Sequence, residues 1–249
     1  RPSPPGGVGG FYTRRIVDLA AFATVTSSLA FRPLLIATQE TAGSAFAWAS
    51  RIVDPQGEDD NDGLAALYND PGPLADDDPF FLPWLAGERV PVDDHRVRGA
   101  FYGLSLRHDR DAMLRAVTEG VVLNTRWVYE KVAAKKGVKL EGPVPLVGGV
   151  AQNPVFAKML ADALNRPVVV GDPQHSGVIG AAAIAAAALK WRGSVWDAAG
   201  AISARRAAAY EPSPQRVEQI GERYRRLDAI RPALIRLYKR DKTKGAARP

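Results

Sequence analysis

The stretch "PLVGGVAQNPVFAKML", Pro145–Leu160, reads as a strand, a turn and a helix in immediate succession. An apolar run ends at Gly148 and Gly149, and Asn153 followed by Pro154 then opens a helix, because Asn is a strong N-cap and Pro suits the first helical position. Glycine has no Cβ, so the pair can let a ligand approach the backbone, and the helix start favours an anion. However, Gly-Gly-X-X-X-Asn is neither the dinucleotide fingerprint nor a P-loop. Taken alone, the turn is open to two interpretations: a ligand-binding turn, or an ordinary corner between strand and helix.

The residues on both sides of this turn alternate between strand-like and helix-like patterns. Apolar positions at helical steps, closed by Gly137, predict a long helix over 109–137. Shorter patterns predict strands at 34–37, 143–147 and 168–170, and helices from about residue 44, near 64–68, over 155–164 and over 180–190. Small residues fill the last helix, which is typical of close packing on a sheet. The proline-punctuated segment 79–99 is predicted to be an ordered loop. The order strand, turn, helix, strand, helix predicts an α/β domain.

The C-terminal segment is basic, and its charge admits two explanations. Apolar residues recur in it at helical spacing: Ile220, Tyr224, Leu227, Ile230, Leu234 and Leu237. This pattern predicts an amphipathic helix over about 213–240 that packs on the body with its charges facing water. A nucleic-acid-binding tail is the alternative. We favour the packed helix and predict no nucleic-acid partner.

Composition restricts the class of protein. The chain has 249 residues, of which 46% are hydrophobic and 24% charged, as is ordinary for a soluble globular protein. The absence of cysteine excludes disulfides, cysteine-based zinc sites and a thiol nucleophile. No apolar run approaches the roughly 18 residues of a membrane span, so we predict a cytoplasmic protein without a membrane partner. The chain begins Arg1-Pro2, which suggests a fragment, and the Pro/Gly-rich start predicts a flexible or remnant lead-in over 1–21.

The candidate metal ligands and catalytic residues do not form a recognisable set. "EDDNDG", Glu58–Gly63, imitates the start of a calcium loop, but Asn69 stands where the bidentate glutamate is needed. His95, His108 and His175 lie far apart and show no metal-binding spacing. We therefore predict no metal site and assign no catalytic residue.

Five blocks, taken in order, resemble the C-terminal half of a sugar kinase of the FGGY family, with xylulokinase-like members most similar. The blocks are "QETAGSAFAW" at 39–48, the segment with Gly-Glu-Arg and Arg-Gly-X-Phe-X-Gly-Leu at 81–106, the helix at 114–127, "VGGVAQN" at 147–153, and the closing strand and Gly-Ala-Ala helix at 161–185. Each block alone is weak evidence, whereas the order and spacing of all five are specific. The resemblance covers residues 22–249, the predicted kinase domain.

The resemblance implies an α/β fold of the actin-like ATPase (ribonuclease H-like) type, a mixed sheet with helices packed on both faces. It implies a nucleotide-binding half that, joined to an N-terminal kinase domain, transfers the γ-phosphate of ATP, with Mg²⁺, to a sugar hydroxyl, a pentulose being favoured. Gly148 and Gly149 would face the phosphates through their N–H groups, and Asn153 would lie by the ribose or adenine. In this context the ligand-binding interpretation of the turn is favoured over the corner.

The chain also departs from the family pattern. Ala112 stands where a polar residue is usual, Thr118 where an apolar one is usual, and His175 where many relatives have glutamate. The family's catalytic aspartate belongs before a Gly-Thr-Ser turn, which "VTSS" at 25–28 only imitates. We therefore expect the chain alone to be inactive, with Asp93 and Asp94 as structural or interface residues. The alternative is a non-catalytic ATP- or sugar-binding regulatory module.

Overall fold

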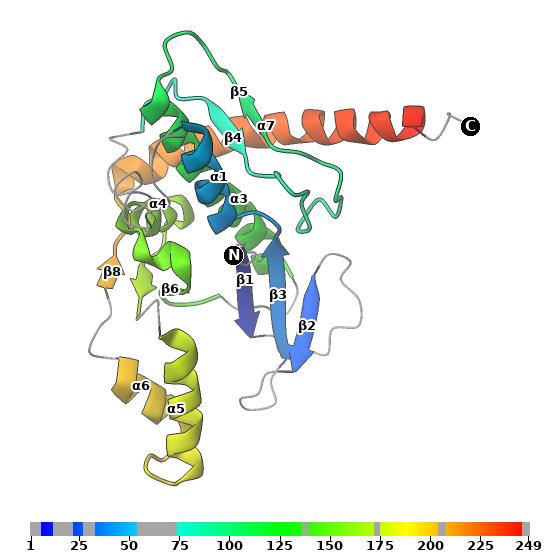
Figure 1. The fold of residues 1–249 in the computed structure, drawn as a ribbon. Coiled ribbons are helices and arrows are strands. Elements are labelled where there is room, and N and C mark those ends of the chain that lie inside the picture. Colours follow the sequence, from blue (N-terminus) through cyan, green and yellow to red (C-terminus); the bar gives the residue numbers. More distant parts are fainter. Residues whose placement is uncertain are drawn as a thin grey trace.

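The computed structural model describes residues 6–11, 22–26, 33–53, 74–135, 138, 140–171, 175–203 and 208–245. The predicted short helix near 64–68 and the calcium-like loop at 58–63 lie outside the described residues. Figure 1 shows three small sheets placed around the long helix α3 (Arg110–Ala133). The helix begins where Asp109 accepts the Ala112 N–H at 2.9 Å, which caps its first turn. The long helix predicted from the sequence is therefore confirmed, although it ends before Gly137.

The first sheet has β3 (Pro33–Gln39) in its centre, antiparallel to both β1 (Gly6–Phe11) and β2 (Ala23–Thr26). The predicted strand at 34–37 lies inside β3, and α1 (Gly43–Val53) starts within one residue of its predicted position. The structure differs from the predicted lead-in over 1–21, because Gly6–Phe11 pairs with β3 along its whole length. A glycine-rich strand has low β-propensity, so only its pairing with β3 identifies it.

Two three-residue strands, β4 (Phe80–Leu82) and β5 (Ala100–Tyr102), form an antiparallel pair beside α3. Strand β4 lies inside the segment 79–99 that was predicted to be an ordered loop, and β5 follows this segment, so the prediction is wrong at 80–82 and holds for the residues between the two strands. Gly120 of α3 packs against β4 so closely that an added Cβ would lie 2.3 Å from the carbonyl oxygen of Phe81. This contact explains a glycine in the middle of a helix, where the residue is otherwise unfavourable.

The third sheet contains β6 (Val144–Leu146) and β7 (Val168–Val170), which are parallel, and β8 (Ala208–Tyr210), which is antiparallel to β7. The connection from β6 to β7 runs through the short 3₁₀ helix η1 (Gly149–Gln152) and α4 (Pro154–Leu164). Both strands and α4 agree with their predicted positions to within one residue. The sequence predicted neither η1 nor β8.

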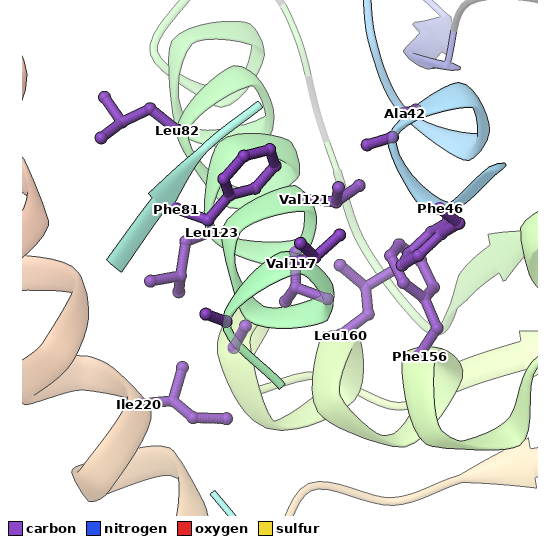
Figure 2. Close-up of a cluster of buried hydrophobic side chains, with 14 of the residues drawn as sticks. Ala42, Phe46, Phe81, Leu82, Val117, Val121, Leu123, Phe156, Leu160 and Ile220 are labelled. Carbon is purple, nitrogen blue, oxygen red and sulfur yellow. The ribbon is translucent and has the colours of Figure 1, made fainter. Parts of the chain in front are cut away.

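The main hydrophobic core lies between α3, α4, α1, β4 and the first turns of α7 (Pro214–Gly245), as Figure 2 shows. Val117 and Val121 of α3 face Leu160 and Phe156 of α4. Phe156 meets Phe46 of α1 edge-to-face, with ring centroids 6.1 Å apart. The helix that follows the opening turn of the sequence is thus fixed through its buried face.

The small-residue helix α5 (Ser176–Ala188) differs from its predicted packing. Its main partner is α6 (Val195–Ser203), and the two helices extend together from the rest of the molecule in Figure 1. Large apolar side chains are exposed along this pair: Val178, Ile184, Leu189, Trp191 and Trp196. Close packing on a sheet was therefore the wrong expectation for this helix.

Helix α7 confirms the predicted helix, and the first part of its predicted apolar face is buried at Ile220, Tyr224 and Leu227, whereas Leu237 near its end is exposed. The prediction that its charges face water is wrong at two positions. Arg223 and Arg231 are 2% and 1% exposed. Arg223 pairs with the buried Glu119, whereas Arg231 bonds Asp228 and the Leu123 carbonyl and lies over the Trp127 ring. Each guanidinium is buried because neighbouring acceptors and rings replace water.

Candidate functional site

The turn between β6 and α4 depends on Gly148, whose backbone has φ 87° and ψ −172°. This region of backbone space is essentially restricted to glycine. Immediately after it, the Ala151 N–H donates to the Gly148 carbonyl at 3.0 Å, which closes the first turn of η1. Gly148 therefore provides the sharp change of direction that lets the chain leave the strand and begin two successive helical turns.

Asn153 is the N-cap of α4, as predicted from the sequence. Its Oδ1 accepts the Phe156 N–H at 3.0 Å, and Pro154 occupies the first helical position. The cap fixes the side-chain oxygen, so the Nδ2 donors are the part of this amide that can meet a ligand. Asn153 thus has a demonstrated structural role at the turn, and its predicted contact with a ribose or adenine stays a prediction.

The outer surface of the turn is open. Gly148 and Gly149 are both exposed, and a Cβ added at either would meet no protein atom within 4 Å. By contrast, Ala151 and Phe156 on the inner side are buried in the main core. The turn therefore presents bare backbone on a rigid support, which is the arrangement that backbone recognition of an anion needs.

The position of the turn in the sheet also favours ligand binding. Gly148 follows the carboxyl end of β6, and Gly171 follows the carboxyl end of the parallel strand β7. Gly171 is likewise open, with nothing within 4 Å of an added Cβ. Ligands of open α/β sheets bind outside the carboxyl ends of the strands. The residues that the sequence singled out thus lie at the edge where this rule places a site.

A buried polar cluster connects three of the sequence blocks through Glu88, Asn124 and Gln39. Asn124 Nδ2 donates to Glu88 Oε2 and to Gln39 Oε1, both at 2.8 Å, and Glu88 Oε1 accepts the N–H groups of Arg89 at 2.9 Å and Glu40 at 3.2 Å. Burial raises the pKa of Glu88 to about 7, although the donors from Asn124, Glu40 and Arg89 favour its charged form. Three blocks that are far apart in the sequence thus meet in one buried cluster, which their local patterns did not predict.

The remaining candidate residues lie apart from the turn. Asp94 is buried and accepts from the backbone N–H and Nε of Arg96, a structural role, whereas Asp93 is exposed at φ 51°. The His108 ring bonds the Ser105 N–H and the Asp77 carbonyl, and His95 and His175 are exposed. Within the described residues, no group of three His, Cys, Asp or Glu side chains is placed to hold a metal ion.

Two departures from the family pattern have a local explanation. Ala112 is buried in the first turn of α3, where its N–H donates to the capping residue Asp109. The Thr118 hydroxyl donates to the Leu114 carbonyl at 3.1 Å, so a buried hydroxyl is satisfied within the helix. None of the helices in the described part of the chain is long and apolar enough to cross a membrane.

Comparison with known proteins agrees with the fold and with the sequence blocks. The model of the FGGY family of carbohydrate kinases, C-terminal domain, matches residues 23–189. The gluconokinase of Bacillus subtilis (strain 168) is 32% identical over 170 residues, which cover 67% of this chain and 31% of that protein. The xylulose kinase of the same organism is 29% identical over 181 residues, or 72% of this chain and 34% of that protein.

Solved structures show the same fold over nearly the whole chain. The gluconate kinase from Lactobacillus acidophilus has a TM-score of 0.79 at 24% identity, covering 96% of this chain and 47% of that one. The xylulose kinase from Rhodospirillum rubrum has a TM-score of 0.78 at 22% identity, covering 96% and 49%. The chain thus spans about a third of the curated relatives and about half of these solved chains. The predicted class, an α/β domain of the actin-like ATPase type, is confirmed, and the chain belongs to the FGGY family of carbohydrate kinases, of which it contains the C-terminal domain.

Proposed function

We propose that this chain is the nucleotide-contributing half of an ATP-dependent sugar kinase. The observation that carries the proposal is the open, glycine-built turn Gly148–Asn153, which lies inside the segment that matches the family's C-terminal domain. The backbone N–H groups of Gly148 and Gly149 would face the phosphates of ATP. Phosphoryl transfer also needs a base for the sugar hydroxyl and a clamp for metal and phosphate, which we assign to an N-terminal kinase domain.

Nucleotide binding is tested with Gly149→Val. An added side chain at this position meets open space, so the protein should keep its fold while the valine blocks the approach of a ligand. Gly148 is less suitable, because its positive φ strains any other residue. In calorimetric titration with ATP-Mg, we expect Gly149→Val to weaken affinity at least about tenfold, or about 1.4 kcal/mol.

Gly200→Val in α6 is the matched control, since this glycine is also exposed and also has open space around it. Its affinity for ATP should stay within about twofold of the unsubstituted chain. Equal affinities of Gly149→Val and the unsubstituted chain would remove the site from the turn. No binding by the unsubstituted chain at millimolar ATP would contradict the proposal as a whole.

Catalysis is proposed only for the two halves together. The purified chain of 249 residues should not phosphorylate D-xylulose, D-gluconate or any other sugar with ATP-Mg, because we assign it no catalytic base. A coupled assay for ADP release measures this, and detectable sugar-dependent turnover by the chain alone is the contrary result.

The sugar is the finer part of the proposal. We favour a pentulose, because the sequence blocks resemble xylulokinase-like members; relatives of this chain include both xylulose kinases and gluconokinases. A cytoplasmic site of action would suit a kinase that uses ATP. A non-catalytic regulatory module that binds ATP or a sugar is the second candidate, and a reading frame upstream of Arg1 that lacks the N-terminal phosphate motifs would favour it.

A further inference from the structure

Arg166 lies two residues after the end of α4 and contacts three acceptors from two other segments. Its Nη1 donates to the Leu140 carbonyl at 2.6 Å and to the hydroxyl of Tyr129, and its Nη2 donates to the Gly142 carbonyl. Its guanidinium also lies 5.9 Å from the centre of the Tyr129 ring. One side chain thus joins α3, the residues before β6 and the residue after α4.

The candidate turn lies, in the sequence, between Arg166 and the two carbonyls that Arg166 bonds. Leu140 and Gly142 lead directly into β6, the turn at Gly148–Asn153 follows, and α4 then runs to Leu164. Arg166 follows this strand-turn-helix unit in the sequence. Its side chain therefore donates to two carbonyls that precede the unit, 24 and 26 positions earlier in the chain. A main-chain hydrogen bond from the Val144 N–H to the Pro167 carbonyl, at 2.7 Å, also joins the start of β6 to the residues after α4.

The backbone of Arg166 is itself fixed. Asn165 ends α4 in the left-handed conformation, with φ 50° and ψ 46°, and the Arg166 N–H donates back to the Ala161 carbonyl at 3.2 Å. This is the bonding expected at the end of a capped helix, and it gives the arginine side chain a defined starting direction. The acceptors are two carbonyls and a hydroxyl, none of which is charged. The guanidinium therefore acts here through the planar arrangement of its N–H donors and not through pairing with a carboxylate.

Among the described residues, the start of β6 has few other interactions that hold it in place. The strand has three residues, and in the described part of the chain it pairs with β7 on one side only. A short edge strand is weakly held by its own ladder. We propose that Arg166 is a positioning residue that holds β6 and thereby keeps the Gly148–Asn153 turn in the conformation that binds the nucleotide. The proposal rests on the function proposed above and adds a residue that does not touch the ligand.

Removal of the guanidinium should loosen the turn locally while the rest of the domain stays folded. The main core is built mainly from α1, α3, α4, β4, β7 and α7, and Arg166 is not a member of its hydrophobic cluster. Arg166→Ala leaves Leu140, Gly142 and Tyr129 without their donor, so β6 and the turn should open more often. The affinity for ATP then falls in proportion to the fraction of molecules in the closed conformation.

Hydrogen–deuterium exchange of the full chain without nucleotide tests this directly. In Arg166→Ala, peptides covering 143–153 should exchange at least about tenfold faster than in the unsubstituted chain, while peptides covering 112–124 of α3 keep their rates. The dissociation constant for ATP-Mg should rise on the order of fivefold. Arg166→Lys, which retains charge but lacks the fork, should give intermediate values for both.

Arg126→Ala is the matched control, because Arg126 is a partly buried arginine of α3 that pairs with Glu130 and lies over the Tyr224 ring. It should leave exchange at 143–153 and ATP affinity unchanged. Unchanged exchange at 143–153 in Arg166→Ala, or equal acceleration in all peptides, would overturn the positioning role, as would local acceleration without loss of ATP affinity. A further outcome separates the two proposals: exchange at 143–153 is faster in Arg166→Ala, but the unsubstituted chain binds no ATP. This result would contradict the proposed function and overturn the nucleotide part of this inference together with it.

Discussion

Replacement of Arg223 by alanine should lower the free energy of unfolding by about 3–5 kcal/mol, the cost of breaking a buried ion pair. Arg223 and Glu119 are 2% and 1% exposed, and the carboxylate is held bidentately, at 2.5 Å from Nε and 2.7 Å from Nη2. Alanine would leave the carboxyl group of Glu119 buried and without its partner. This arrangement links α7 to the centre of α3, so its loss affects the whole domain.

The arginine is also bound to the chain that leads into β4. Its remaining N–H groups donate to the carbonyls of Ala75, Asp76 and Asp78 at 3.4, 2.9 and 3.0 Å, so all five donors of the guanidinium are used. Alanine therefore removes the hydrogen bonds of three buried or partly buried carbonyls in addition to the charge pair. These carbonyls place the expected loss toward the upper part of the range.

Equilibrium unfolding in urea, followed by circular dichroism, measures the effect. Arg225→Ala is the control, because Arg225 is an exposed arginine two positions further along α7 and its removal should change stability by less than about 0.5 kcal/mol. The double variant Arg223→Met, Glu119→Leu removes both charges and should be more stable than Arg223→Ala alone. A loss below about 1 kcal/mol for Arg223→Ala would show that the pair is not coupled to the fold in this way.

The parts of the fold that the sequence predicted are those with local signals. The strand, glycine pair and Asn153 cap of the opening stretch lie within sixteen consecutive residues, and each signal is a property of the residue itself. Helix α4 and strand β7 follow from the same kind of pattern. Such local signals predict the turn and its Asn153 cap, which the structure has, whereas its contact with a nucleotide stays a prediction.

The parts that were missed depend on contacts between distant residues. Arg223 looks like any charged residue of an amphipathic helix, and only Glu119, 104 positions earlier, explains its burial. In the same way, Arg166 acquires a role only when residues 140–142 lie beside it, and the glycine-rich β1 is a strand only because β3 is its neighbour. Helical spacing identified the buried apolar face of α7 and contained no information on which charges would be satisfied inside.

The contribution of Glu88 to the stability of the domain should fall as the pH rises from 4.5 through 7. Glu88 is fully buried, and burial raises its pKa from 4.5 to about 7 in the folded chain. The folded state therefore binds this proton more tightly than the unfolded state between these values, so protonation favours folding. The stabilising contribution is complete below pH 4.5 and is lost as the pH passes 7. At about 1.4 kcal/mol for each pH unit, it amounts to about 3 kcal/mol.

The charged groups around Glu88 support this sign. Glu40 presents its backbone N–H to Glu88 Oε1, but its like-charged carboxylate adds to the effect of burial, and the contact from α3 is the neutral amide of Asn124.

Glu88→Gln removes the titration and keeps the size of the side chain, so the difference in unfolding free energy between wild type and this variant should change by about 3 kcal/mol from pH 4.5 to pH 8. Glu218→Gln, which removes an exposed carboxylate of α7, is the matched control and should follow the wild-type curve. If Glu88→Gln keeps the wild-type dependence on pH, the buried carboxylate is not its source, and the contact between the blocks at Gln39, Glu88 and Asn124 is insensitive to protonation.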